Sequence, residues 1–178
     1  MGRIGCLGLS LSCQLVAILI SKSRNLFIRF NNDIAIITVK EPFDFSDPKV
    51  QPIDWFKKDD PVIPGDTICN NTGWGLTNGI NIALPNALQW IQIPLHSDEE
   101  CRQEPDLGSY ITEGMVCAGS AGHASCNGDS GGPLVCPDAS GKGKLAGIVS
   151  FGMGGCTSMG VYAKVSQYDD WIQERLIA

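Results

Sequence analysis

From residue 65 onward the chain is a series of short apolar runs separated by turn residues. The runs lie around residues 67–69, 88–95, 114–118, 133–136, 144–150 and 160–165. The sequence holds 21 Gly and 10 Pro, a content that suits many short strands joined by turns better than a helical protein. This spacing predicts an all-β barrel or sandwich.

The flanking segments have other patterns. Residues 26–30 and 34–39 are β-rich and are separated by Asn31-Asn32-Asp33, and a Pro-rich extended connection follows over residues 42–64. At the other end, Ser166-Gln-Tyr-Asp169 fits a capping box, and apolar side chains recur on one helical face, at Tyr168, Trp171, Ile172 and Leu176. A short C-terminal helix is therefore expected.

The first 24 residues allow three interpretations. Residues 4–20 are mostly apolar, but the run is short for a membrane span. Arg3 ahead of the apolar run resembles a secretory signal, although no A-x-A-like cleavage triplet follows. The segment is a signal or signal-anchor, translated non-native sequence, or a genuine buried strand.

The eight cysteines indicate disulfides and an oxidising compartment, because they form no paired C-x-x-C units that would bind zinc. Cys6 and Cys13 stand apart; the other six lie in the Gly-rich part of the chain, and the sequence alone leaves their pairing open. The net charge of -6 argues against a nucleic-acid partner. No cofactor or metal site is visible, and a secreted, extracellular protein is expected.

The segment Cys126-Asn127-Gly128-Asp129-Ser130-Gly131-Gly132-Pro133 carries the most specific chemistry. A nucleophilic Ser must stand on a tight turn so that its hydroxyl projects into a cleft, and Gly128 permits that turn. The N–H groups of Gly128 and Ser130 can then stabilise one tetrahedral oxyanion. A Gly-rich turn with an incidental Ser is the blander alternative.

This segment resembles the nucleophile loop of the chymotrypsin/trypsin family of serine proteases. Further segments resemble the family in its own order: Asn32-Asp-Ile-Ala35, Thr72-Gly-Trp-Gly75, residues 88–101, Met115-Val-Cys-Ala-Gly119, Gly147-Ile-Val-Ser-Phe-Gly152 and Gly160-Val-Tyr-Ala-Lys-Val165. The resemblance runs from about Asn25 to Ala178. It implies a chymotrypsin-like double β-barrel: an aberrant or signal-like segment over 1–24, a remnant of an incomplete first barrel and a connection over 25–64, and the second barrel with the helix over 65–178.

The resemblance also implies residue roles. Ser130 is the nucleophile, Asp33 the carboxylate that supports an imidazolium, and Gly128 and Ser130 the oxyanion donors. It implies the disulfides Cys69–Cys136, Cys101–Cys117 and Cys126–Cys156. Cys6 and Cys13 match nothing in the family and could pair, remain free or be absent from the mature protein.

The specificity pocket is implied in the same way. Ala124, Gly152 and Gly160 line it, and Ala124 stands where trypsin-like members hold an Asp, so no carboxylate is available for Arg or Lys. A preference for large apolar or aromatic side chains follows. Ser150, Phe151 and Gly152 are expected to bind substrate backbone as an added antiparallel strand.

The resemblance to the family does not extend to the general base. The family takes it from a His on an Ala-Ala-His-Cys segment upstream of the Asp, whereas the only His residues here are His96 and His123, and neither aligns with it. An Ile-Val-Gly-Gly segment, whose ammonium pairs in the family with the residue equivalent to Asp129, is absent too. Asp129 is therefore expected to lack a partner, and much of the first barrel to be missing.

Two functions remain open, beside a remote third in which Ile4–Ile20 anchors the protein to a membrane. The chain is a truncated or misassembled product of a secreted serine endopeptidase, inactive without the His, or a non-catalytic homologue that binds a protein through the substrate cleft. Expected partners are protein or peptide substrates and protease inhibitors; a membrane is not expected, and the folded chain is expected to be a monomer. Asn70-Asn71-Thr72 is a glycosylation sequon, but use is not expected because it abuts Cys69 and a strand.

Overall fold

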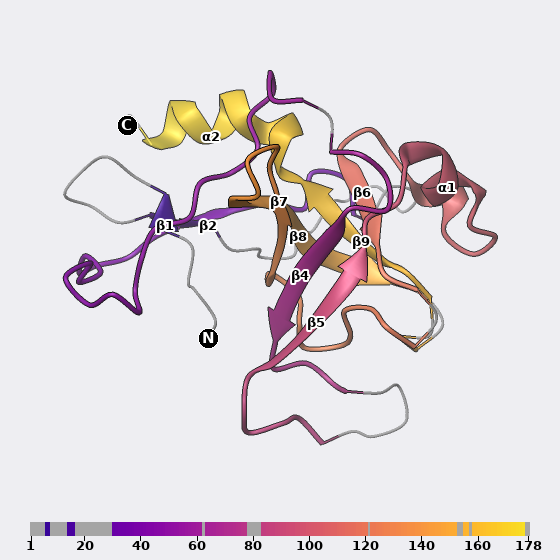
Figure 1. The fold of residues 1–178 in the computed structure, drawn as a ribbon, viewed down its shortest axis with the longest axis horizontal. Coiled ribbons are helices and arrows are strands. Elements are labelled where there is room, and N and C mark those ends of the chain that lie inside the picture. The colour runs from indigo at the N-terminus through magenta and orange to yellow at the C-terminus, as the bar shows by residue number, and fades with distance from the viewer. Residues whose placement is uncertain are drawn as a thin grey trace.

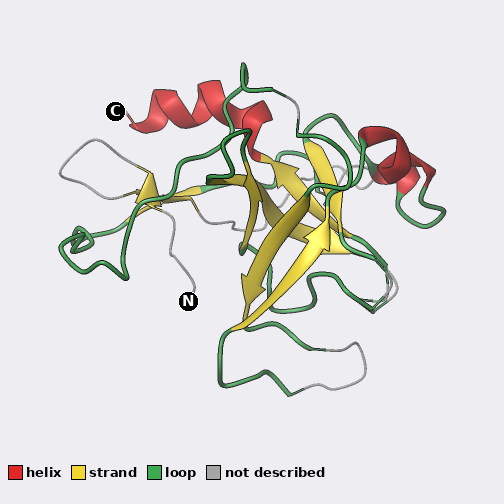
Figure 2. Cartoon of the chain, viewed as in Figure 1, coloured by secondary structure: helices red, strands yellow, loops and turns green. Residues whose placement is uncertain are grey.

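The computed structural model describes residues 6–7, 14–16, 30–61, 63–77, 83–120, 122–152, 155–156 and 158–176. Strands rather than helices form the body of this part of the chain, long loops connect them, and the two α-helices lie at the periphery (Figure 2). The strands are β1 (Cys6–Leu7), β2 (Gln14–Val16), β3 (Ile36–Thr38), β4 (Ile68–Gly73), β5 (Gln89–Pro94), β6 (Met115–Ala118), β7 (Pro133–Pro137), β8 (Gly143–Gly152) and β9 (Gly160–Lys164). The helices are α1 (Asp98–Gln103) and α2 (Asp169–Leu176), with 3-10 helices at Gly108–Tyr110 and Val165–Tyr168.

A six-stranded antiparallel sheet, in the order β5-β4-β7-β8-β9-β6, forms the body of the molecule (Figure 1). An antiparallel bridge between Leu95 and Ala118 joins the ends of its two edge strands, so the sheet curls back on itself. Apolar side chains that alternate along these strands fill the interior. They include Ile93, Leu134, Val149 and Tyr162, each at most 3% exposed.

A second, three-stranded sheet, in the order β1-β2-β3, lies in the N-terminal part of the described chain. Within residues 1–24, for which a genuine buried strand was one of three interpretations, the structure describes only the short strands β1 and β2. Cys13 and residues 26–29 of the strand expected at 26–30 lie outside the described residues, and Phe30 is in a turn. An all-β fold with an incomplete first barrel and a short C-terminal helix is confirmed.

The helices cover two further, separate apolar clusters, with α2 and α1 at different ends of the main sheet in Figure 1. Under α2, Ile172 packs with Trp55, Ile148 and Val165. The expected capping box at 166–169 is wrong: residues 165–168 form a 3-10 helix, and α2 begins at Asp169. Tertiary packing of Val165 and Ile172 fixes this helix instead.

A capping box does open α1, a helix that the sequence pattern did not predict. The Ser97 hydroxyl accepts from the Glu100 N–H, and the Glu100 carboxylate accepts from the Ser97 N–H. Cys101 on this helix is buried and packs with Leu107 and Val161. The helix thereby covers one side of β6 and β9.

Candidate active site

The segment 126–133 folds into consecutive tight turns that lead into β7. Gly128 and Gly131 have φ values of 99° and 83°, a region that favours glycine. The loop is fastened to β8, because Gly131 N–H donates to Val149 O and Val149 N–H donates to Gly132 O. Ser130 directly precedes these two anchored glycines, and its side chain is exposed. The turn thus presents a hydroxyl to solvent, as a nucleophile requires.

The N–H groups of Gly128 and Ser130 have no acceptor among the described residues. A side chain at residue 128 would meet the backbone, since its Cβ would lie 3.1 Å from Gly75 Cα. Glycine therefore lets the loop pack closely while leaving its N–H available. Two free donors beside an exposed hydroxyl can stabilise negative charge on a ligand oxygen.

Asp129 has partners, contrary to the expectation from the sequence. Its Oδ1 accepts from Gly75 N–H at 2.8 Å, and its Oδ2 accepts from Cys126 N–H at 2.8 Å. Gly73 and Gly75 leave the space for this carboxylate, because a Cβ on either would clash with it. Backbone donors thus hold the loop without an ammonium group. A cavity of about 300 Å³ adjoins Asp129.

Asp33 is buried, at 4% exposure, in the segment that leads into β3. The Ser150 hydroxyl donates to Asp33 Oδ2 at 2.6 Å. This hydrogen bond holds the carboxylate against β8, the strand to which Ser150 belongs. The other oxygen, Oδ1, is shielded from solvent and has no hydrogen-bond partner among the described residues. Buried polar atoms are costly to leave unpaired, and a carboxylate oxygen can accept a further N–H.

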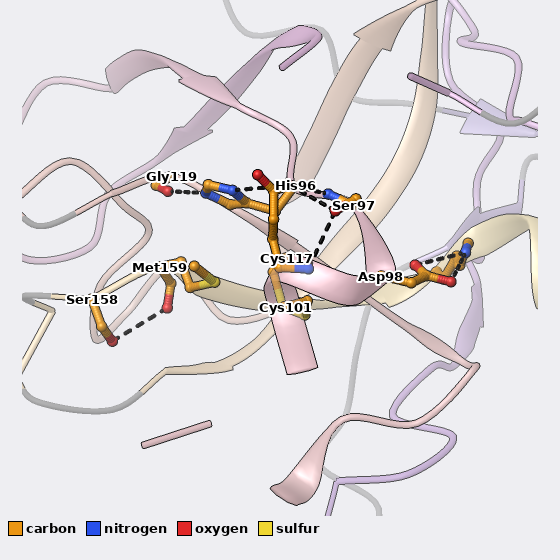
Figure 3. The surroundings of a disulfide bond; sticks show 10 residues. His96, Ser97, Asp98, Cys101, Cys117, Gly119, Ser158 and Met159 are labelled. Atoms are coloured by element: carbon orange, nitrogen blue, oxygen red, sulfur yellow. Dashed lines mark hydrogen bonds and ion pairs between the residues drawn. A yellow bond between two sulfur atoms is a disulfide. The ribbon is translucent and has the colours of Figure 1, made fainter. Parts of the chain in front are cut away.

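Neither histidine meets Asp33 or Ser130. His96 donates from Nε2 to Gly119 O at 2.5 Å and lies near the Cys101–Cys117 disulfide (Figure 3). Its Nδ1 lies 4.0 Å from the Glu100 carboxylate. His123 is exposed, and its backbone pairs with Ser120. No described residue therefore supplies an imidazole to the carboxylate or to the hydroxyl.

The residues expected to line the specificity pocket differ in burial. Ala124 is half-buried, Gly152 is exposed and Gly160 is buried. A Cβ on Gly160 would lie 2.6 Å from Ser125 Oγ and 3.2 Å from the Tyr162 ring. These two buried side chains were missed by the sequence analysis, although Tyr162 falls within a segment that it singled out.

Tyr162 adds a polar group to this wall. Burial raises its pKa to about 12, so the phenol stays protonated. The hydroxyl lies beside Ser125 but makes no well-formed hydrogen bond among the described residues. A buried, protonated hydroxyl without a partner can bind a polar atom or a water molecule.

The end of β8 offers a strand edge. β7 pairs with β8 only as far as Ile148, whereas β9 pairs with the far end at Phe151 and Gly152. Phe151 also stacks on Phe30, with ring centroids 4.6 Å apart. Phe30 was not predicted from the sequence, because nothing local signals a contact with so distant a residue. The edge at 150–152 can accept an extended peptide.

Three disulfides brace these loops: Cys69–Cys136, Cys101–Cys117 and Cys126–Cys156. The first lies inside the curled sheet, the second ties α1 to β6, and the third holds the nucleophile loop. The described residues hold no His, Cys, Asp or Glu cluster that could bind a metal ion. In the same part of the chain, no helix combines the length and apolarity needed to cross a membrane.

Comparison with known proteins agrees with this geometry. The trypsin family model matches residues 14–172, so the similarity begins upstream of Asn25. The chain is 42% identical to trypsin II-P29 of Gallus gallus over 158 residues, which is 85% of this chain and 58% of that protein. It is also 42% identical to chymotrypsin-C of Mus musculus over 153 residues, 82% of this chain and 55% of the relative. The chain thus spans little more than half the length of these relatives. It belongs to the trypsin/chymotrypsin-like family of serine proteases.

Proposed function

We propose that this chain carries the nucleophile, the acid and the oxyanion donors of a serine endopeptidase, but not the general base. The observation that carries the proposal is the buried Asp33, held by Ser150 at Oδ2 and without a partner among the described residues at Oδ1. A buried carboxylate with one free oxygen is what the N–H of a supporting imidazole requires. The chain alone is therefore inactive.

The proposed reaction is attack on a peptide carbonyl. Ser130 Oγ forms a bond to the carbonyl carbon, the C=O electron pair moves to oxygen, and Gly128 and Ser130 N–H groups stabilise that oxyanion. The Ser130 proton passes to an imidazole and then to the leaving amine as the C–N bond breaks. Without that base, about 10³- to 10⁴-fold acceleration over water is the most that remains.

The pocket residues support a preference for a large apolar or aromatic side chain before the cleaved bond. Ala124 brings no charge, and Gly152 and Gly160 add no side chains to the walls. The partly buried surroundings penalise a Lys or Arg that finds no carboxylate. The preference applies to any form of the protein in which the site is complete.

A peptidyl boronate tests the site without requiring turnover, because boron forms a reversible bond with a serine oxygen. We expect a boronate with a Phe side chain to bind the refolded, oxidised chain, and Ser130→Ala to abolish this binding. Ser109→Ala is the matched control, since Ser109 is an exposed serine outside the site. Equal binding to the wild type and Ser130→Ala would overturn the proposed site.

Turnover tests the inactivity separately. A chromogenic Phe amide should be hydrolysed no faster by the wild type than by Ser130→Ala. Activity that disappears with Ser130→Ala would show that a base is supplied elsewhere. A transcript that encodes a His-Cys segment upstream of Asn25 would identify the chain as part of an active endopeptidase.

The second candidate is a non-catalytic homologue that binds a partner through the cleft. It is favoured by the free edge at 150–152 and by the stacked Phe30 and Phe151 beside it. An extended peptide with an aromatic residue should then bind Ser130→Ala as tightly as the wild type, and Phe151→Ala should weaken binding. Dependence on Ser130 would instead favour the endopeptidase.

The proposal also includes that the protein is secreted and that the chain divides into three parts. The three disulfides support an oxidising, extracellular compartment. The division is a signal-like or aberrant segment over 1–24, a first-barrel remnant over 25–64 and a second barrel with its helix over 65–178. Limited proteolysis checks it: cleavage should fall before residue 65 and leave the remainder intact.

A further inference from the structure

The outer face of β4 carries a feature that the proposed function does not use. Along this strand Cys69 and Asn71 are buried, while Asn70 is exposed. Asn71 turns inward, and its Nδ2 donates to Pro133 O at 3.0 Å. The Asn70 carboxamide makes no hydrogen bond to any described residue. Alternation along the strand therefore leaves one free amide on the outside of the sheet.

Gln92 lies directly opposite Asn70 on β5, and apolar side chains lie nearby on the same face. In the antiparallel register Thr72 lies opposite Trp90, so Trp90 is the diagonal neighbour of Asn70. Trp90 is 63% exposed, and Ile68, two residues before Asn70, is 50% exposed. A groove of about 410 Å³ runs here, lined among others by Asn70, Thr72, Trp90 and Val135.

The geometry points to Asn70 as an N-glycosylation site whose first sugar lies in this groove against Trp90. Asn70-Asn71-Thr72 is the acceptor tripeptide, and Asn70 is exposed in the folded chain. The adjoining strand forms as the sequence predicts, but it does not exclude the modification. The glycan is added to the unfolded chain, so the fold has only to leave the amide facing outward.

The transfer balances with a lipid-linked oligosaccharide diphosphate as the donor. The Asn70 Nδ2 forms a bond to the anomeric carbon of the first sugar, and the bond from that carbon to the diphosphate oxygen breaks. The amide loses one proton, and the lipid diphosphate leaves. The Thr72 hydroxyl completes the tripeptide that the transferase recognises.

A glycan also suits the surface physically. A pyranose ring has an apolar face of C–H groups that can pack on an indole, and exposed Trp90 and Ile68 lie within its reach. Covering these side chains with a hydrated sugar removes apolar surface from water without a protein partner. This inference does not depend on the proposed protease site, but it rests on the proposed secretion.

The test expresses the full chain behind a cleavable secretion signal in mammalian cells. Treatment with peptide-N-glycosidase should increase the mobility of the protein from the endoplasmic reticulum and the medium. Thr72→Val and Asn70→Gln should abolish this shift, whereas Thr72→Ser should retain it. Since the sequence holds no other sequon, the shift reports on Asn70 alone. A wild-type chain unmodified in both fractions overturns the proposal.

A second variant tests the place of the sugar. Trp90→Ala keeps the tripeptide and should still be modified. Enzymatic removal of the glycan should then lower the thermal midpoint of the wild type by more than that of Trp90→Ala. Equal shifts would show that the glycan does not rest on Trp90.

Discussion

The hydroxyl of Ser150 donates a 2.6 Å hydrogen bond to Asp33 across a sequence separation of 117 residues. Asp33 precedes β3, in the smaller sheet, and Ser150 lies on β8, in the larger one. The bond thus connects the acid of the proposed site to the strand that carries its peptide-binding edge. This hydrogen bond joins the two sheets, and a single substitution can remove it.

Ser150→Ala should destabilise the chain by about 1–3 kcal/mol, because it leaves a second buried oxygen of Asp33 without a donor. Urea unfolding measures the change. Ser109→Ala, at an exposed serine, should alter stability by less than about 0.5 kcal/mol. The double variant Ser150→Ala/Asp33→Asn should lose less than the sum of the two single changes. Strict additivity would show that the two side chains are not coupled.

Asp129→Ala should destabilise the nucleophile loop, since the N–H groups of Gly75 and Cys126 both lose their acceptor. We expect a loss of about 2 kcal/mol, together with faster hydrogen exchange at these two amides. Asp106→Ala is the matched control, because Asp106 is exposed and makes no described hydrogen bond. Unchanged exchange in Asp129→Ala would contradict the role of the carboxylate as the holder of this loop.

Asp169 links the C-terminal helix to the connecting segment. Its Oδ1 accepts from Trp55 Nε1 at 2.8 Å, and its Oδ2 accepts from Lys58 N–H at 3.2 Å. Burial acts to raise the pKa of this carboxyl, but hydrogen bonds from Gln173, Lys58 and Trp55 outweigh it and lower the pKa below 3.8. The folded state therefore binds the proton less readily than the unfolded chain.

The sign of the pH dependence follows from this lowered pKa. The stabilisation by Asp169 is present above the unfolded pKa and disappears as the pH falls through the folded pKa. Asp169→Asn should therefore cost more stability at pH 6 than at about pH 3. Trp55→Phe should remove about 1–3 kcal/mol at pH 6, because the carboxylate loses its indole donor. Equal losses from Asp169→Asn at both pH values would refute this account.

Gly160→Ala should damage the pocket wall, since its Cβ would lie 2.6 Å from Ser125 Oγ. Overpacking of this kind costs about 1–3 kcal/mol. Gly152→Ala is the matched change on the other wall, where the nearest atom to a Cβ, Met159 O, is 3.9 Å away. It should fold like the wild type. Thermal unfolding checks the contrast, and equal midpoints for the two variants would contradict the packing described here.

The local sequence pattern predicted the strands of the main sheet well. The strand runs between residues 67 and 165 appear close to where alternation and turn residues placed them, because both are properties of neighbouring residues. The disulfides connect the pairs that the family resemblance implies. The signature of the α1 capping box was also present, at Ser97 and Glu100, and was overlooked.

Contacts between distant segments could not be predicted. The partners of Asp129 are backbone N–H groups, which every residue carries and no sequence pattern distinguishes. Phe30 meets Phe151 only because the two sheets adjoin. The false capping box at 166–169 shows the same limit: buried Val165 and Ile172 set the geometry there more strongly than the local signature.

The order of the main sheet has a consequence for how the chain acquires its shape. β4 has β7 as a neighbour, and the disulfide between these strands joins residues 67 apart in the sequence. Such high contact order makes the search for the native pairing slow, because chain entropy is lost before the distant strands can interact. Oxidation of Cys69 and Cys136 would make this costly pairing permanent once it is found. The rate of thiol oxidation, more than the strength of any single contact, should then govern the yield of native protein.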